Sequence, residues 1–366
     1  MTPATPLADI SEWLALGPYA LAAPQKSAWL GATLSQLTAL HYESCPKYAR
    51  ILDLLGVNPV AERTPEETPF LPVRLFKEME LLSVPHEQVF KTMTSSGTSG
   101  QQVSRIYLDK ETAALQSKVL SRLMTDLLGK SRRPMLVIDS PSVLRQRNTF
   151  SARSAGVLGF SLFGHDVTYA LDEQMNLDLP TIHTFLERHA GQAVFLFGFT
   201  FMVWQHFCLA LEQKNLTLPL EGGILLHGGG WKKLQDQAVD NHTFRQRLIA
   251  CTGLTRVANY YGMVEQTGSI YMECEKGHLH APVYSDVLIR DHRDFSILPA
   301  GQTGLVEVVS MLPRSYPGHA LLTEDLGIWL GEDDCPCGRL GRYFSISGRI
   351  AQAETRGCSD TYAVTV

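Results

Sequence analysis

The chain has 366 residues, of which 45% are hydrophobic and 19% are charged, and its net charge is −5. This composition is typical of a globular protein and excludes a disordered chain, and the length suits about two domains or one large domain with appendages. The acidic balance gives no support to a nucleic-acid-binding surface.

The first sixty residues are predicted to be helical. Leu30, Leu34, Leu37 and Leu40 recur at helical spacing, and Ser27 is a candidate N-cap for that helix.

The composition of the N-terminus and the number of cysteines predict the cellular compartment of the protein. Acidic residues and a Gly17-Pro18 break interrupt the first thirty residues, so they predict neither a signal peptide nor a membrane span. The seven cysteines are odd in number and lack a framework spacing. A reduced, cytoplasmic protein is therefore expected.

A run of hydroxyl-bearing and glycine residues follows a predicted strand near residue 90, and residues 105–108 form a second predicted strand. The run is thus expected to join a hairpin. Glycines let backbone N–H groups approach an anion, and hydroxyl groups add donors, so the run suits phosphate binding. It lacks the lysine of a Walker loop, and a flexible surface turn is the alternative. Its residues are Thr94, Ser95, Ser96, Gly97, Thr98, Ser99 and Gly100.

Short apolar runs alternate with helical patterns in the middle of the chain. Residues 115–127 carry one apolar helical stripe, and the runs at 135–138, 194–198 and 224–227 each end in glycine, serine or aspartate. Strands that alternate with helices predict an α/β sheet whose strand ends carry the site.

Three glycines, Gly228, Gly229 and Gly230, follow the predicted strand at 224–227. They would let a flat ligand or an acyl chain lie against the backbone, with a tight turn as the alternative.

The segment NYYGMVE combines aromatic rings with a carboxylate. An aromatic ring at Tyr260 or Tyr261, beside Gly262, can stack on a purine, and Glu265 can hold the Mg²⁺ that phosphate oxygens require. A core tyrosine with a surface glutamate is the alternative.

Two later segments carry charged side chains, the first of them at a predicted strand–turn junction. Asp325, in TEDLG, suits contact with ribose hydroxyls, although Asp-x-Gly is also common in turns. Arg349 supplies a guanidinium for phosphate or ribose.

Cysteines and histidines in two distant segments have the spacing of a zinc site. Cys274, His278 and His280 stand in C-x3-H-x-H, and Cys335 and Cys337 stand in C-x-C. Paired thiolates and imidazoles match tetrahedral Zn²⁺, and four ligands make a structural site. His280 is weakly favoured over His278 as the fourth ligand, and exposed reduced cysteines on two loops are the alternative.

A more β-rich part of the chain begins near residue 300, with no obvious linker before it. We expect residues 1–300 to form an α/β core with a helical N-terminal segment. Residues 301–366 would be the β-rich C-terminal part of the same core, with the zinc knuckle and a short tail.

The ordered set TSSGTSG, YYGMVE, TEDLG and GR-x4-E-x-RG resembles the successive signatures of adenylate-forming enzymes. More closely, TSSGTSG, HGGGWK and RGCSD resemble the acyl-protein synthetase family, the long-chain-fatty-acid–protein ligase of the bacterial luminescence fatty-acid reductase complex. The resemblance runs from about residue 70 to the C-terminus. The ordered set is specific, although each motif alone is not.

The resemblance implies the fold of the large N-terminal domain of adenylate-forming enzymes. It also implies ATP-dependent formation of an acyl-AMP from a carboxylic acid, with a fatty acid expected. The acyl group would then pass to an enzyme cysteine and on to an acyl-accepting or reductase partner protein. By position, residues 94–100 would cradle the phosphates and residues 228–230 would line the adenylate and acyl site. Tyr261 would stack on adenine, Glu265 would hold Mg²⁺, Asp325 would grip the ribose, Arg349 would contact ribose or phosphate, and Cys358 would accept the acyl group.

One feature departs from the wider superfamily. Ordinary CoA ligases continue past the GR-x4-E-x-RG segment into a lid that carries a catalytic lysine, whereas this sequence ends at Val366. CoA ligation by this chain alone is therefore not expected. The alternatives are an acyl- or aryl-CoA ligase that obtains its lid from another chain, and a non-catalytic nucleotide- or acyl-binding subunit.

Overall fold

Twelve strands of the described chain join into one mixed sheet. The computed structural model describes residues 10–95, 103–144, 152–231 and 237–350. One half of the sheet is parallel, in the order β5 (Gly164–Tyr169), β4 (Arg133–Val137), β6 (Phe195–Phe199), β7 (Ile224–Gly228) and β8 (Arg256–Tyr261). The predicted α/β fold is confirmed.

The antiparallel half continues from β8 without a break. Its order is β9 (Tyr271–Glu273), β10 (Leu279–His280), β14 (Arg342–Arg349), β13 (Ala320–Glu332), β12 (Thr303–Ser310) and β11 (Ser285–Arg290), with β1 (Leu71–Pro72) beside β13. Because β11 pairs with β12, the sheet crosses residue 300 continuously. The division proposed at residue 300 stays a prediction.

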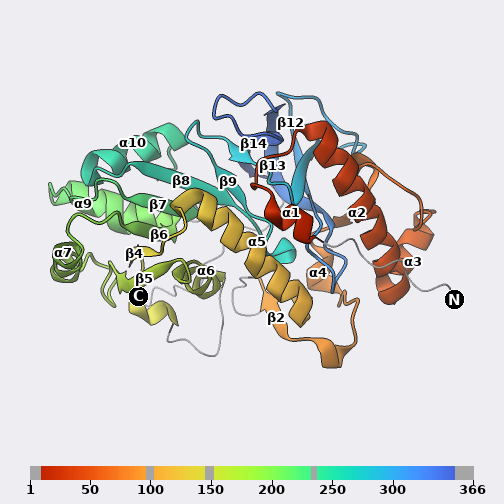
Figure 1. Cartoon of the computed structure of the whole chain (residues 1–366), viewed down its shortest axis with the longest axis horizontal. Coiled ribbons are helices and arrows are strands. Elements are labelled where there is room, and N and C mark those ends of the chain that lie inside the picture. The colour runs from red at the N-terminus through yellow and green to blue at the C-terminus, as the bar shows by residue number, and fades with distance from the viewer. Residues whose placement is uncertain (1–9, 96–102, 145–151, 232–236, 351–366) are drawn as a thin grey trace.

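Helices cover both faces of the parallel half (Figure 1). The face that presents Met135 and Val137 is covered by α5 (Lys110–Leu128) and α6 (Ala152–Ser161). The face that presents Leu136 and Ile138 is covered by α7 (Leu179–Arg188), the π-helical η4 (Val203–Cys208), α9 (Leu209–Gln213) and α10 (Asn241–Thr252). A parallel strand buried on both faces has a continuous apolar sequence, which explains why the sequence predicted β4, β6 and β7.

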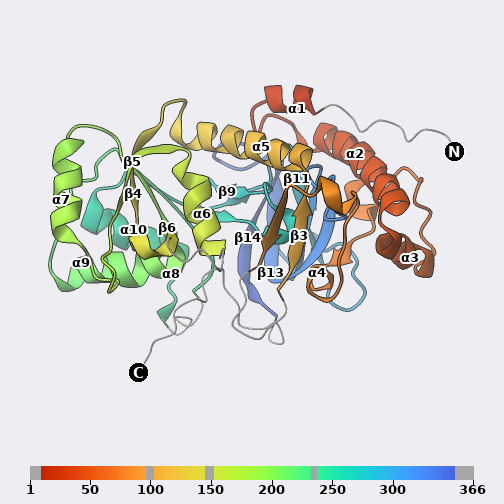
Figure 2. The same ribbon diagram turned by 90° about the horizontal axis from the view of Figure 1, so that it is seen from below.

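The predicted hairpin is also present. β2 (Lys91–Thr94) pairs antiparallel with β3 (Arg105–Leu108) as a separate two-stranded sheet, and α5 runs from the end of this hairpin toward the parallel half (Figure 2). The buried stripe of α5 includes Leu115, Val119, Leu123 and Leu127, as expected from their spacing.

Short elements connect the larger ones, and no helix among the described residues is long and apolar enough to cross a bilayer. The short helices are α1 (Ser11–Ala15), α4 (Leu75–Glu78) and α8 (Thr200–Met202), and the 3-10 turns are η1 (Pro65–Glu67), η2 (His86–Gln88), η3 (Pro141–Leu144) and η6 (Val264–Gln266).

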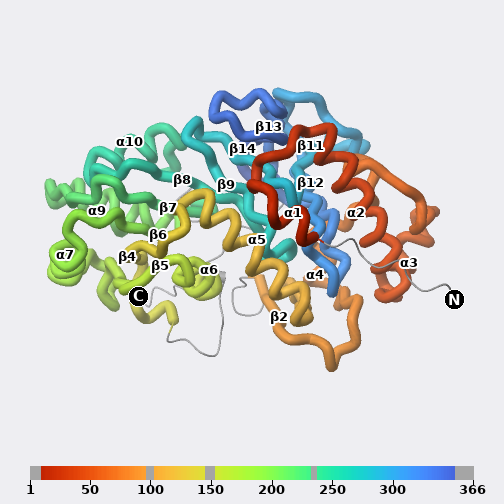
Figure 3. The backbone as a smooth tube through the Cα atoms, in the orientation of Figure 1, coloured from red at the N-terminus to blue at the C-terminus, as the bar shows by residue number. Residues whose placement is uncertain are grey.

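The N-terminal helices α2 (Ala23–Ser44) and α3 (Pro46–Leu54) lie beside the antiparallel half (Figure 3). The prediction that Ser27 caps α2 is wrong, because the helix begins one turn earlier, at Ala23, with a proline in its first turn. Ala22 at the N-cap has no side-chain acceptor. Instead, the Asp333 carboxylate, from the turn between β13 and β14, accepts the Ala23 N–H at 2.9 Å.

Buried charges join α2 to the antiparallel half. The Lys26 ammonium is 3.4 Å from Asp286 and donates to the Ala281 carbonyl. Lys26 is 1% exposed. Because an isolated buried charge is costly, removing one partner of such a pair typically destabilises a protein by about 3–5 kcal/mol.

A pair of buried histidines lies at the same contact. The rings of His41 on α2 and His319 stack at 5.1 Å between centroids. His41 Nε2 lies 3.1 Å from the Pro313 carbonyl, which can only accept, so Nε2 carries the proton and Nδ1 accepts from Ser83. Burial lowers the pKa of His41 to about 3, against a smaller opposite effect of the Pro313 carbonyl. His41 is therefore a neutral, satisfied core residue.

His41 should make the stability of the fold depend on pH. The unfolded chain protonates this histidine below about pH 6.5, whereas the folded chain does not until near pH 3. The stabilising effect of His41 is thus complete above about pH 6.5 and is lost as the pH falls, by up to about 1.4 kcal/mol per pH unit. In denaturant unfolding of wild type and His41→Gln from pH 7.5 to 5, the difference in unfolding free energy should be constant above about pH 6.5 and should shrink, at up to that rate, below it. A difference independent of pH would contradict a neutral buried His41.

Candidate active site

The predicted site residues gather where the strands of the parallel half end. Because parallel strands all end at one edge of a sheet, the residues that follow β4, β6, β7 and β8 lie along one edge. Strands β13 and β14 of the antiparallel half bring Asp325 and Arg349 to the same region, where Asp325 bonds to Tyr261 at the end of β8.

Three of the predicted nucleotide contacts form one hydrogen-bonded group. The Tyr261 hydroxyl donates to one oxygen of Asp325 at 2.7 Å, and Arg349 Nε donates to the other at 2.8 Å. Asp325 and Arg349 are also direct partners across β13 and β14. Burial, reinforced by the nearby Asp325, raises the pKa of Tyr261 well above its usual value, so the phenol stays a neutral donor. Each carboxylate oxygen keeps a second lone pair that could accept a ligand hydroxyl.

Glu265, the predicted magnesium ligand, lies on η6 and is 7% exposed. Burial raises the pKa of its carboxyl, while the Ser104 hydroxyl and the charges of Lys77 and Arg349 act in the opposite direction. Ser104 precedes β3, and its N–H donates to the Ser95 hydroxyl at 2.9 Å. The base of the predicted phosphate loop therefore lies beside Glu265. Thr94 and Ser95 are described there, whereas Ser96, Gly97, Thr98, Ser99 and Gly100 lie outside the described residues.

The ring of Tyr260 lies against the backbone of Gly228. A Cβ at Gly228 would be 2.4 Å from Tyr260 Cε1, so only glycine leaves room for this ring. On its other side the ring contacts Phe160 of α6, with centroids 5.2 Å apart. Since neighbouring residues of a strand point to opposite faces, Tyr260 faces α6 while Tyr261 faces Asp325. The structure thus separates two tyrosines that the sequence placed in one motif.

Two polar side chains that were not predicted to have a role, His227 and Asn259, also lie at this edge. The Thr200 hydroxyl has a single hydrogen and donates to the Gly228 carbonyl at 3.2 Å, so His227 Nδ1 must donate to Thr200 at 3.0 Å. His227 Nε2 is then a bare acceptor that is buried without a hydrogen-bond partner among the described residues, and so is Asn259 Oδ1. His227 and Asn259 are register neighbours on β7 and β8 and therefore share one face. Burial lowers the pKa of His227 to about 3, so the ring stays neutral.

A buried ion pair was also missed, because its partners come from different segments. Arg153 of α6 donates to both oxygens of Asp139, which follows β4. Both residues are nearly fully buried. The pair fixes the position of α6, and hence of Phe160, against the edge of the sheet.

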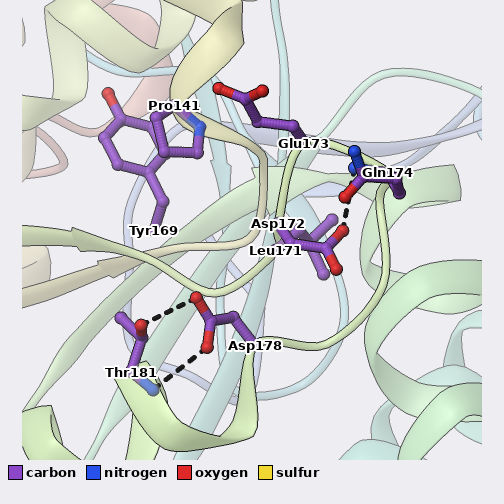
Figure 4. Close-up of a pocket in the computed structure, with 8 residues that line it drawn as sticks. All are labelled: Pro141, Tyr169, Leu171, Asp172, Glu173, Gln174, Asp178 and Thr181. Atoms are coloured by element: carbon purple, nitrogen blue, oxygen red, sulfur yellow. Dashed lines mark hydrogen bonds between the residues drawn. The ribbon is translucent and has the colours of Figure 1, made fainter.

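A pocket of about 370 Å³ opens farther along this edge, after β5 (Figure 4). Its carboxylates are already used locally. Asp178 caps α7 by accepting from the N–H and hydroxyl of Thr181, and Asp172 accepts the N–H groups of Gln174 and Asn176. None of the predicted site residues lines this pocket.

The predicted zinc ligands come together at the opposite ends of some of the same strands. Cys274, His280, Cys335 and Cys337 each offer one ligand atom, and these four atoms lie within 4.8 Å of one another. Strand β14 connects this cluster to Arg349 and spans eight residues, about 26 Å at 3.3 Å per residue. The cluster is therefore distant from the predicted nucleotide contacts. Cys358, the predicted acyl acceptor, lies outside the described residues.

A family model and two curated relatives agree on the family that this chain resembles. The family model described as "Acyl-protein synthetase, LuxE" matches residues 8–365. A long-chain-fatty-acid–luciferin-component ligase of Vibrio harveyi is 25% identical over 324 residues, which are 87% of this chain and 83% of the relative. The ligase of the same name from Aliivibrio fischeri is 22% identical over 273 residues, 72% of this chain and 70% of the relative.

Two solved structures share the fold. An open conformation of 2-hydroxyisobutyryl-CoA ligase, in complex with 2-HIB-AMP and CoA, matches with a TM-score of 0.68 at 15% identity, over 93% of this chain and 79% of that chain. The postadenylation state of that ligase, in complex with 2-HIB-AMP, matches with a TM-score of 0.68 at 16% identity, over 90% and 69%. At this identity the likeness shows the fold alone, which is that of adenylate-forming CoA ligases.

The contact between Gly228 and Tyr260 can be tested by stability. Gly228→Ala should reduce the free energy of unfolding by about 1–3 kcal/mol, because the added methyl group overlaps the ring. Gly230→Ala is the matched control, since its Cβ would meet nothing within 4 Å among the described residues, and it should change stability by less than about 0.5 kcal/mol. Adding Tyr260→Ala should make the change at Gly228 nearly neutral. Equal denaturant midpoints for the two single variants would contradict the contact.

Proposed function

The chain belongs to the acyl-protein synthetase (LuxE) family, and we propose that it activates a fatty acid with ATP and transfers the acyl group to a cysteine thiol. One observation carries the proposal most directly. Tyr261 and Glu265 of one segment meet Asp325 and Arg349 of two others at the strand ends of a fold shared with adenylate-forming ligases. The relatives named long-chain-fatty-acid–luciferin-component ligase support a long-chain fatty acid as the substrate.

The polar groups of the edge suit a purine nucleotide. The second lone pairs of Asp325 would accept the ribose hydroxyls, while Tyr261 and Arg349 hold the carboxylate in place. Asn259 Oδ1 is a buried acceptor without a partner among the described residues, and it would suit the exocyclic amino group of adenine. His227 Nε2, on the same face, would accept a second hydrogen bond from the ligand or from a bound water.

Glu265 and the hydroxyl–glycine loop would hold the phosphates with Mg²⁺. Burial disfavours the charged form of Glu265, so a cation beside it would stabilise the carboxylate that binds metal. When bound, Mg²⁺ would neutralise charge on the phosphates and on the departing pyrophosphate. Ser95, at the base of the loop, bonds to Ser104 beside this carboxylate, which supports the proposal.

The proposed reaction has two balanced steps. In the first, a carboxylate oxygen of the acid attacks the α-phosphorus of ATP, and pyrophosphate leaves. In the second, a thiolate attacks the acyl carbon, the bond to AMP oxygen breaks, and AMP leaves. Activation is needed because a free carboxylate resists nucleophiles, whereas an acyl adenylate carries a good leaving group.

Cys358 is our candidate for the acceptor thiol. Of the six cysteines that the structure describes, five are buried, and the sixth, Cys337, belongs to the metal cluster. A second acceptor, a partner protein that takes the acyl group from the thioester, is part of the same proposal. One structural Zn²⁺ at the cysteine–histidine cluster completes the set of cofactors.

Two rival functions make different predictions. Exchange of labelled pyrophosphate into ATP, tested with a panel of acids of increasing chain length, separates an adenylating enzyme from a nucleotide-binding subunit. Mass spectrometry then separates acylated protein from acyl-CoA when CoA is added. No exchange with any acid would overturn the adenylation proposal, and acyl-CoA as the sole thioester would favour a CoA ligase.

Glu265→Gln should reduce pyrophosphate exchange roughly 100-fold, because it removes the charge partner of the metal and preserves the shape of the side chain. Glu187→Gln, an exposed position on α7, is the control and should keep the wild-type rate. Circular dichroism should show both variants folded. A folded Glu265→Gln protein with wild-type exchange would refute the metal role of Glu265.

Cys358→Ser should separate the two steps. With labelled fatty acid and ATP, acyl-AMP should still form, while the hydroxylamine-labile label on the protein should disappear because serine gives an ester instead of a thioester. Undiminished labile label would place the acceptor elsewhere. Cys208 and Cys251 would be examined next, although both are buried.

A further inference from the structure

The segment that carries Cys335 and Cys337 of the cysteine–histidine cluster also holds the start of α2. The turn between β13 and β14, residues 333–341, contains Cys335 and Cys337 and contacts residues 18–26 from the other end of the chain. We propose that a zinc ion bound by Cys274, His280, Cys335 and Cys337 fastens this N-terminal segment to the sheet. The inference rests on the proposed zinc site and does not depend on the adenylation chemistry.

The geometry decides between the two histidines. His280 is fully buried on β10, and its Nε2 lies 3.4 Å from Cys337 Sγ, inside the group of four ligand atoms. His278 is not in this group, and its Nδ1 lies 3.3 Å from Cys335 Sγ. His278 therefore suits an outer role as a hydrogen-bond donor to a thiolate ligand.

A bound cation would explain why three cysteine thiols lie so close together. Cys274 and Cys335 are both buried, and their sulfur atoms belong to the group of four ligand atoms that lie within 4.8 Å of one another. Three thiolates so close together would repel one another without a metal, whereas Zn²⁺ binds thiolates and one imidazole in a tetrahedron. Backbone groups already suit thiolates, since the Arg339 N–H points at Cys337 Sγ at 3.4 Å.

The same turn contacts the N-terminal segment at several points. Asp333 accepts the Ala23 N–H that begins α2, and it also accepts the Gly341 N–H at 2.7 Å, which closes the turn. The Leu340 N–H donates to the Tyr19 carbonyl at 3.2 Å, and the Arg339 guanidinium lies 4.1 Å from the centre of the Tyr19 ring.

The strand that carries His280 extends this contact. The carbonyl of Ala281 accepts the ammonium of Lys26 on α2, and the Val283 N–H donates to the Pro18 carbonyl at 2.8 Å. The edge of the Tyr19 ring also faces the His280 ring, with centroids 5.8 Å apart. Both segments that supply ligands thus hold residues 18–26, and the metal would join these two segments to each other.

Metal content tests the ligand set. The purified protein, never exposed to chelator, should contain about one zinc per chain by plasma mass spectrometry. His280→Ala should lose most of the metal, whereas the matched variant His278→Ala should keep it. A metal-free wild type, or metal lost from His278→Ala and kept by His280→Ala, would overturn the assignment.

Hydrogen exchange tests the fastening in the wild-type protein, so it does not depend on whether the variants fold. Removal of zinc by a chelator should increase amide exchange of residues 18–26 by roughly tenfold or more, and added Zn²⁺ should reverse the increase. The strand at residues 133–137 is the internal control and should be unchanged. Equal exchange of residues 18–26 with and without zinc would refute the proposed fastening.

Discussion

The change from parallel to antiparallel pairing between β8 and β9 determines where the candidate active site and the cysteine–histidine cluster lie. Up to β8, all strands of the parallel half end at one edge, so their loops can surround a ligand. Beyond β8 the strands pair antiparallel, so neighbouring strands run in opposite directions. Strands β13 and β14 can then bring Asp325 and Arg349 to that edge while the turn between them carries Cys335 and Cys337 at the far end. One set of strands serves the proposed chemistry at one end and the proposed metal at the other.

The charged groups of the candidate site illustrate how a fold stabilises groups that it buries. A phenol and a guanidinium each donate to one oxygen of Asp325. Glu265 is buried, and burial raises its pKa despite the opposite effect of the Ser104 hydroxyl. This difference fits two proposed tasks. Asp325 would be held in advance to bind neutral hydroxyl groups, whereas the charged form of Glu265 would be fully stabilised only when a cation binds.

The sequence predicted what depends on local pattern. The buried parallel strands, the β2–β3 hairpin and the stripe on α5 follow from periodicity and turn chemistry, and the cysteine–histidine spacing indicated four residues that the fold brings together. What failed or was missed depends on partners distant in sequence. The cap of α2 comes from Asp333. The faces to which Tyr260 and Tyr261 point depend on strand β8 being flanked on both sides. His227 and Asn259 are noticeable only because each has a buried acceptor without a partner among the described residues.

The cap that Asp333 supplies to α2 has a consequence for how the chain is made. Asp333 and Ala23 are 310 positions apart, so a ribosome exports the whole of α2 long before the carboxylate that completes its first turn exists. Contacts of such sequence separation are slow to form, since the intervening chain must be ordered first. We therefore expect α2 to pack against the sheet only after the last strands have joined it, and its apolar stripe to stay exposed until then. A nascent chain in that state is the kind that chaperones bind.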